Sequence, residues 1–413
     1  MNDRVTRRGF VATVGAIAIA GCSGVTGDRS SDRSTAMDDS ATSAATTSTA
    51  SGEGSLPPLA DRSLVLPMEP PQLREAAVSG GVSKDGIPAI DQPRFEAAGQ
   101  VGGRLAPGDV VFGIARNGVA KAYPQSILVH HEVCNDTLDG TPIGVTYCPL
   151  TGTAVGFERG ETTFGVSGRL VNDNLIMYDR ATEHWWPQVL ATAIPGWNAD
   201  GDASGTDGGR TNGAGSVQSN TSGSATSNTS RDGTPNATIG RSLREFRVVW
   251  TTWQRWRDQF PDTRVLTEDT GYIRDYGQDP YGSYSPPSGY YEPESEPLFP
   301  PLDTDDRYPT KAVVVGARTT DGAIAFHKRS LRREGVITGS LDGTPHVGVH
   351  DDRLDTAYVY RNADGASVTT TPDGVRVADT VHPPDELPLE RVHAFDAMWF
   401  AWHGFYPATS VYG

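Results

Sequence analysis

Short apolar runs bounded by turn residues dominate the chain after about residue 100, and such runs are typical of β-strands. The clearest of them predict strands at 110–114, 119–123, 144–147, 154–157, 164–166 and 175–178. A different spacing follows Thr252, where Trp253, Trp256 and Phe260 fall on one face of a helix that ends near Pro261. The pattern predicts a mainly β fold with a few short helices.

The same pattern occurs twice along the chain. Residues 110–159 read VVFG…GVAKAYP…LDGTPIGVTYCPLTGTAVGFER, and residues 313–361 read VVVG…GAIAF…LDGTPHVGVHDDRLDTAYVYR. Leu138 corresponds to Leu341, which lies 203 positions later (341 − 138). The Trp-rich helix also recurs near the end of the chain. A repeat of this length indicates a duplicated domain. We therefore expect an α+β fold, mainly β, with two related units from an internal duplication, each ending in a Trp-rich helix.

The composition divides the chain into segments of different character. Its predicted parts are an export signal (1–21), a disordered Ser/Thr-rich tether (22–57), the first unit (58–266), an ordered Pro/Tyr-rich connection (267–311) and the second unit (312–413). A second low-complexity run, at about 200–238, interrupts the first unit. It contains three glycosylation sequons, at Asn220, Asn228 and Asn236.

The N-terminus has the features of an export signal. Arg7 and Arg8 precede an apolar run, 11–20, that is too short to span a bilayer, as in twin-arginine signals. The run ends at Gly21-Cys22 as in a lipoprotein, so we expect Cys22 to carry the lipid. The protein is then anchored through this lipid on the outer face of the cytoplasmic membrane. An ordinary cleavage site or an uncleaved anchor is the alternative.

The charge of the chain excludes one class of partner. Its net charge is −16 and its pI is about 5.0, and it has lysine at only four positions, Lys84, Lys121, Lys311 and Lys328. Such an acidic, lysine-poor chain resembles the proteins of halophilic archaea. Because it repels phosphate backbones, nucleic acid is not an expected partner.

The first unit carries the reactive side chains that the second lacks. His130, His131 and Glu132 precede Cys148, and a thiolate beside an imidazole can act as a nucleophile or bind a soft metal. Met177 adds a thioether, which gives a ligand set suited to copper or zinc. The alternatives are ordinary hydrogen-bonded histidines, a core methionine and a disulfide between Cys148 and the other cysteine of the unit, Cys134.

Four stretches of the chain carry a resemblance to a known family. They read AYPQSILVHHEVCNDTLDGTPIGVTYCPLTGTAVGF, FGVSGRLVNDNLIMYDRATEHWWPQ, TTWQRWRDQFPDTRVL and YGQDPYGSY, and they are similar to the DUF3179 family of exported bacterial and archaeal proteins. The resemblance implies no activity. It matches His131, Glu132, Asn135, Asp136 and Cys148 to the family pattern. Cys134 stands where an aliphatic residue is usual, which disfavours a disulfide, and the run at 200–238 departs from the compact spacing of the family.

These observations leave three hypotheses open for a cell-surface lipoprotein. The first is a metal-binding or redox module in which Cys148 and His131 are ligands. The second is a Cys-His hydrolase or transferase, with Cys148 as nucleophile, His131 as base, and Asn135 or Asp136 orienting the imidazole. The third is a ligand-binding surface protein without catalysis. Polar residues at strand ends are expected to line the same cleft: Ser167, Arg169, Asn172, Asp179, Trp186 and Gln188.

Overall fold

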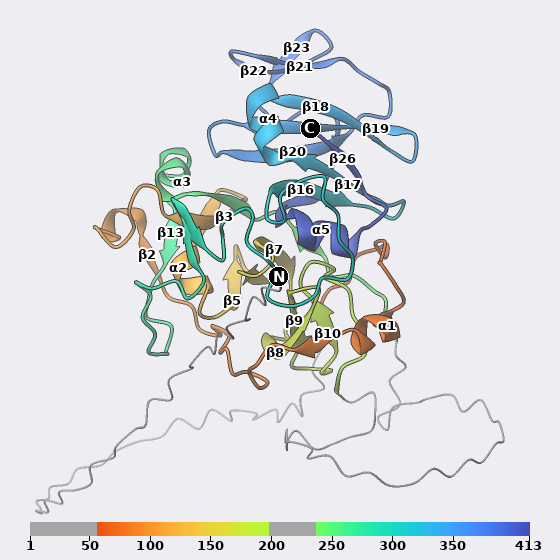
Figure 1. Ribbon diagram of the computed structural model, residues 1–413. Coiled ribbons are helices and arrows are strands. Elements are labelled where there is room, and N and C mark those ends of the chain that lie inside the picture. The colour runs from red at the N-terminus through yellow and green to blue at the C-terminus, as the bar shows by residue number, and fades with distance from the viewer. Residues whose placement is uncertain (1–55, 198–236) are drawn as a thin grey trace, which may run out of the picture. The chain divides into compact units, whose positions relative to one another are not determined.

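The computed structural model describes residues 56–197 and 237–413, which form a mainly β fold with short helices (Figure 1). The mainly β character of the expected fold is therefore confirmed. The predicted export signal, the lipidation site Cys22 and the sequons at Asn220, Asn228 and Asn236 lie outside the described residues. Among the residues described, none of the helices is long and apolar enough to cross a bilayer.

The described residues of the first unit form three sheets, with the orders β12-β3-β4-β13-β2, β11-β7-β6-β5 and β1-β8-β9-β10. Their strands are β1 Val78–Ser79, β2 Phe95–Ala97, β3 Val110–Arg116, β4 Val119–Pro124, β5 Val133–Leu138, β6 Thr141–Cys148, β7 Thr153–Glu158, β8 Phe164–Val171, β9 Asn174–Asp179, β10 Trp185–Pro187, β11 Glu245–Phe246, β12 Val249–Thr252 and β13 Arg264–Leu266. The helices are α1 Pro70–Glu75, η1 Ala98–Gln100, α2 Gln125–Leu128 and α3 Trp253–Gln259. Each strand predicted from an apolar run is present.

The second unit has the sheet orders β25-β16-β17-β26, β18-β19-β20-β24 and β21-β22-β23. Its strands are β16 Val313–Arg318, β17 Ala323–His327, β18 Val336–Leu341, β19 Thr344–Asp351, β20 Thr356–Arg361, β21 Val368–Thr371, β22 Gly374–Val377, β23 Thr380–His382, β24 Glu390–Val392, β25 Ala394–Met398 and β26 Ser410–Tyr412. Its helices are α4 Lys328–Glu334 and α5 Trp399–Phe405.

Matching strands of the two units pair in the same register. The β5–β6 hairpin places Leu138 opposite Thr141, and the β18–β19 hairpin places Leu341 opposite Thr344. The order β12-β3-β4-β13 in one unit corresponds to β25-β16-β17-β26 in the other. The two LDGTP segments therefore form the same turn in the same sheet position, as the sequence pattern predicts.

The Trp-rich helices pack in the same way in both units. A Cβ added to Gly113 would lie 2.2 Å from the ring of Trp256, and one added to Gly316 would lie 2.2 Å from the ring of Trp402. Only glycine admits each indole against its strand, so these aromatic residues belong to the core. Thr252 occupies the N-cap of α3 as predicted, but its side chain makes no capping hydrogen bond.

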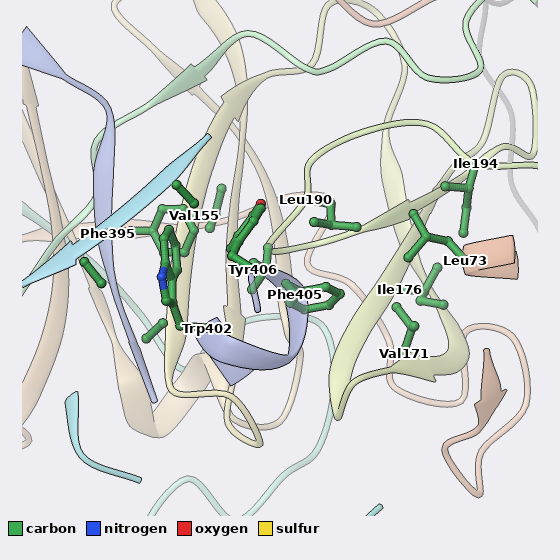
Figure 2. Close-up of a cluster of buried hydrophobic side chains, with 14 of the residues drawn as sticks. Leu73, Val155, Val171, Ile176, Leu190, Ile194, Phe395, Trp402, Phe405 and Tyr406 are labelled. Atoms are coloured by element: carbon green, nitrogen blue, oxygen red, sulfur yellow. The ribbon is translucent and has the colours of Figure 1, made fainter. Parts of the chain in front are cut away.

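A buried apolar cluster joins the two units. Figure 2 shows Val155 and Ile176 of the first unit in one cluster with Phe395, Trp402 and Phe405 of the second. These side chains are at most 2 % exposed, so their burial depends on both units being folded.

A buried ion pair also crosses from one unit to the other. Arg318 on β16 donates to the Glu245 carboxylate on β11 at 2.6 Å, and both side chains are at most 4 % exposed. Because loss of one partner would leave a buried charge, removal of either residue should destabilise the contact between the units.

The described residues on either side of the low-complexity run lie side by side. Ala193 N–H donates to the Arg241 carbonyl at 3.0 Å, and Gly240 N–H donates to the Ala193 carbonyl at 2.9 Å. An isolated bridge between Thr192 and Ser242 extends this contact. The two flanks of the run are thus held side by side by backbone hydrogen bonds.

The connection between the units is ordered by local and long-range hydrogen bonds. It contains a short hairpin of β14 Gly282–Tyr284 and β15 Pro287–Gly289. Tyr291 follows the hairpin and is 4 % exposed. At the end of the connection, the Lys311 ammonium group donates to the Tyr290 carbonyl at 2.5 Å. The hairpin region supplies several tyrosines to the site described next.

Candidate functional site

The turn between α2 and β5 holds Glu132 in a left-handed backbone conformation, with φ of +58°. Its N–H donates to the Leu128 carbonyl at 2.7 Å and its carbonyl accepts from Tyr147 N–H at 2.9 Å. This conformation costs a residue with a Cβ about 1 kcal/mol, which glycine avoids. The matching turn of the second unit has Gly335, with φ of +74°. A strained residue at a buried turn points to a role for its side chain.

The Glu132 carboxyl is buried without a hydrogen bond. The residue is 7 % exposed, and among the described residues none donates a hydrogen bond to its carboxyl. Burial raises the pKa of Glu132 from 4.5 to about 8. The carboxylate lies close enough to Cys148 and Tyr281 for its charge to raise the pKa of both. The site thus contains a carboxyl, a thiol and a phenol.

Cys148, at the end of β6, has a protonated thiol. Burial, and after it the Glu132 charge, raises the pKa of Cys148 from 9.0 to about 11. The sulfur contacts the Asp173 carbonyl at 3.6 Å and accepts from Leu175 N–H at 3.4 Å. A nucleophilic cysteine needs a lowered pKa. The surroundings of Cys148 therefore do not favour the expected thiolate, because the site is desolvated and next to an acid.

The ring of His131 is hydrogen-bonded to residues other than Cys148. Its Nδ1 donates to the Pro88 carbonyl at 2.7 Å, and its Nε2 lies 2.8 Å from the Tyr276 hydroxyl. Burial lowers the pKa of His131 to about 4, so the ring is neutral and Nε2 accepts from Tyr276. Both ring nitrogens are occupied. The predicted pair of Cys148 and His131 as nucleophile and base is thus corrected.

The other member of the His-His pair also binds the connection. His130 Nε2 donates to the Gln278 carbonyl at 2.9 Å. Together with the contact between His131 and Tyr276, this bond holds 276–278 against the end of α2. The two histidines therefore position the connection over Glu132.

Asn135 and Asp136 project from opposite faces of β5 and do not contact His131. The Asn135 amide donates to Asp91 at 2.7 Å and to the Phe164 carbonyl at 2.8 Å. Asp136 accepts from Lys121 at 2.7 Å and from the Tyr123 hydroxyl at 2.6 Å. These bonds join β5 to the neighbouring sheets. The expectation that either residue orients the His131 imidazole is wrong.

Cys134 and Cys148 are both free and buried. Cys134 pairs with Val145 across the hairpin, three residues before Cys148. Because side chains alternate along a strand, an odd separation places the two sulfurs on opposite faces of the sheet. The disulfide alternative is therefore excluded in this structure.

The predicted metal ligands are not gathered in one place. Met177 lies in the same buried apolar cluster as Cys148, whereas His130 and His131 are bonded to the connection. In the part of the chain that the structure describes, no group of three or more His, Cys, Asp or Glu residues could hold a metal ion. The expected ligand set of Cys148, His131, His130 and Met177 is corrected on this geometry.

Four tyrosines of the connection cover the site: Tyr281, Tyr284, Tyr290 and Tyr291. Tyr284 and Tyr291 stack with ring centroids 3.9 Å apart, and both lie near Tyr147, whose hydroxyl is 3.0 Å from that of Tyr284. Asp279 accepts from the Tyr291 hydroxyl at 3.0 Å and from the Gln125 amide at 2.7 Å. The sequence indicated that this segment is ordered, but not that it lies next to the Glu132 turn.

The remaining polar candidates serve the fold. Ser167 donates to the Ile176 carbonyl at 2.5 Å, Trp186 donates to Asp179 at 2.9 Å, and Asn172 donates to the Ala401 carbonyl at 2.8 Å. Gln188 is fully buried and accepts from Thr153 at 2.6 Å. Arg169 lies on β8 opposite Ser79 of β1. These bonds account for their polarity without a cleft.

Comparison with known proteins identifies a family and no activity. The model of a family described as "Protein of unknown function (DUF3179)" matches residues 84–204 and 220–409. No curated protein and no solved structure matches the chain. The match covers well over half of the sequence, so the chain belongs to the DUF3179 family.

Proposed function

We propose that this member of the DUF3179 family is an exported enzyme, lipid-anchored through Cys22, whose first unit carries a proton-transfer site centred on Glu132. The single observation that carries the proposal is the Glu132 carboxyl, which is 7 % exposed, has no hydrogen-bond donor among the described residues and stands on a left-handed backbone. A fold has no reason to keep such a group, since an apolar or glycine residue would be more stable there.

The location rests on the N-terminal sequence. Arg7 and Arg8 before a short apolar run, followed by Cys22, are typical of an exported lipoprotein. The acidic, lysine-poor composition resembles that of halophilic proteins. Replacement of Cys22 by Ser should release the protein from the membrane fraction. Retention of this variant on membranes would contradict the lipid anchor.

The two units are best explained by an internal duplication. Their strands share order and register, and the shared positions, such as Gly113 and Gly316, serve packing. The positions that differ, such as Glu132 and Gly335, are those of the site. We assign the second unit a structural role without the chemistry of the first.

The chemistry of the site is acid–base. With a pKa of about 8, Glu132 has both its protonated and its ionised form populated in mildly alkaline solution. The carboxyl can therefore take a proton from one atom of a bound molecule and return it to another. Cys148 and Tyr281 stay neutral beside it, because burial raises the pKa of both. This environment suits a small uncharged substrate with an exchangeable proton.

A soft metal ion is the second candidate. It is favoured by the Cys148 thiol lying near the Glu132 carboxyl and in one buried cluster with Met177. Copper or zinc bound there would replace the thiol proton. Metal analysis of the matured protein separates the two candidates. One equivalent of metal in the wild type that is lost in Cys148→Ser would favour this second function.

The test of the acid–base proposal compares wild type with Glu132→Gln. The carboxyl resonance of ¹³C-labelled glutamate should reveal one group that titrates near pH 8 and disappears in the variant. Both proteins are then incubated with a fractionated small-molecule extract, and turnover is followed by mass spectrometry. We expect a compound that the wild type consumes and Glu132→Gln does not.

The matched control is Glu158→Gln, a Glu-to-Gln change on β7 of the same sheet. Glu158 pairs with Arg116 at 3.2 Å and is not part of the site. This variant should keep both the titration and the turnover. Equal turnover by wild type and Glu132→Gln, or the absence of a glutamate that titrates near pH 8, would overturn the proposal.

A further inference from the structure

A cavity lies where the two units meet, and its lining includes neither Glu132 nor Cys148. It has a volume of about 300 Å³, at the lower end of the range for small-molecule sites. Its apolar wall comes from both units and includes Trp256, Phe260 and Leu354. A second hollow of about 260 Å³ shares Arg247 and Arg391 with it. The two guanidinium groups therefore line both hollows.

The charge of this cavity is opposite to that of the chain. Four arginines line it, in a protein with a net charge of −16: Arg116, Arg247, Arg353 and Arg391. The lining also includes the carboxylate of Asp385, which forms an ion pair with Arg353 at 2.6 Å. Arg116 is paired with Glu158 at 3.2 Å. Two of the four positive charges are thus neutralised within the protein.

Arg247 and Arg391 are not neutralised. Within 56–197 and 237–413, no carboxylate lies at ion-pair distance from either group, which sets them apart from Arg116 and Arg353. Arg247 donates only to neutral oxygens, those of the Ala394 carbonyl at 2.7 Å and the Thr356 hydroxyl at 2.6 Å. Its Nε is buried without a partner. A buried guanidinium donor of this kind calls for an anion.

The two guanidinium groups lie against the same ring. Arg247 is 4.6 Å and Arg391 is 4.3 Å from the centroid of Tyr358. Like charges held together on one aromatic ring repel each other, and the repulsion from Arg391 adds to burial in lowering the pKa of Arg247. Asp396 also acts on Arg247, but Lys328 pairs with that carboxylate. A ligand that carried two negative charges would relieve this repulsion.

We infer that this cavity binds a small organic phosphate monoester. Arg247 and Arg391 hold the phosphate, and the wall of Trp256, Phe260 and Leu354 packs against the organic part. A phosphate monoester carries a charge of about −2 at neutral pH, which matches two unpaired arginines better than a carboxylate does. The site is independent of Glu132, so its test and that of the proposed function fail separately.

Titration calorimetry of the mature chain with four probes tests the inference. Phenyl phosphate carries both the dianion and a ring, inorganic phosphate lacks the ring, benzoate is a monoanion and phenol is uncharged. We expect saturable binding of one phenyl phosphate per chain, weaker binding of inorganic phosphate and of benzoate, and no binding of phenol. Absence of saturable phenyl phosphate binding, or equal binding of phenol, would overturn the inference.

Arg391→Gln is the decisive variant, because Arg391 is exposed and its replacement should not disturb the core. It should weaken phenyl phosphate binding by about tenfold or more, as expected for loss of a charge-assisted contact. The matched control is Arg376→Gln on β22, an exposed arginine that donates to the Asp379 carbonyl at 3.3 Å away from the cavity. Equal affinity of Arg391→Gln and wild type would reject the site.

Discussion

The turns at Glu132 and Gly335 share one backbone and differ in their side chains. Gly335 N–H donates to the Leu331 carbonyl at 2.7 Å and its carbonyl accepts from His350 N–H at 2.8 Å, which repeats the two bonds of Glu132. The second unit fills this left-handed position with the residue that it favours. The first unit fills it with a strained, buried acid. The turn is therefore a feature of the fold in both units, whereas the buried carboxyl occurs only in the first.

The same contrast holds at the end of the following strand. Asp351 takes the place of Cys148 and is fully buried, but Arg353 donates to it at 2.8 Å and 2.9 Å. Its charge is therefore satisfied within the second unit. The first unit has instead a neutral thiol beside an acid without a partner. At this strand end the buried charge is balanced in the second unit and left open in the first, which is where a ligand would act.

The largest expected effect comes from Glu132→Gln, measured against pH. In the folded protein the pKa of Glu132 is about 8, above its ordinary value of 4.5. The stability that the protonated Glu132 contributes is therefore fully present below pH 4.5 and is lost as the pH rises through 8. The free energy of unfolding of Glu132→Gln, relative to that of wild type, should therefore rise by up to about 5 kcal/mol between pH 4 and pH 9. Chemical unfolding at both pH values measures this. A pH-independent difference would contradict the pKa, and Glu158→Gln is the control.

Two glycine substitutions test the shared packing. Gly113→Ala and Gly316→Ala each place a methyl group into an indole ring, and each should destabilise the protein by about 3 kcal/mol or more. The effects should be alike, because Trp256 and Trp402 pack alike. Thermal unfolding of both variants measures the change. If one alanine were tolerated and the other not, the two units would differ in their cores as well as in their chemistry.

A smaller effect on stability tests the backbone strain at the Glu132 turn and at the matching Gly335 turn. Glu132→Gly and Glu132→Ala both remove the carboxyl, but only alanine keeps a Cβ at positive φ. We expect the glycine variant to be more stable than the alanine variant by about 1 kcal/mol. Gly335→Ala should lose at least as much, because its methyl group also approaches Thr370. Equal stability of the two Glu132 variants would show that the turn relaxes.

The smallest effect concerns the docking of the connection. His130→Ala removes the bond to Gln278 and should cost about 1 kcal/mol, with faster amide exchange in 276–284. Arg333 holds the matching position and forms an exposed pair with Glu334, so Arg333→Ala should change stability by less than about 0.5 kcal/mol. Hydrogen exchange followed by mass spectrometry compares the two. Unchanged exchange in His130→Ala would mean that other contacts hold the segment.

The strands, the repeat and the Trp-rich helices could be predicted because each depends on local spacing. The site could be predicted only in part. Glu132 and Cys148 were singled out from the sequence, but the pairing of Cys148 with His131 was wrong, since the partners of His131 come from residues 88 and 276. Such distant contacts leave no local pattern.

The sequence does contain a signal against the disulfide. The LDGTP turn fixes the hairpin register, which places Cys134 opposite Val145 and hence on the face away from Cys148. Counting residues back from this turn would have excluded the disulfide. The cover of Tyr281 over Glu132 could not be counted in this way, because it depends on how the connection docks.

The backbone bonds around Ala193 and Arg241 make the segment between them exchangeable. Because these bonds already bring the two flanks together, the closure of the fold does not depend on what joins them. Lengthening a closed loop twofold costs only about 0.6 kcal/mol. We therefore expect that an epitope or a fluorescent domain put in place of residues 198–236 would leave the Glu132 turn and the arginine-lined cavity unchanged.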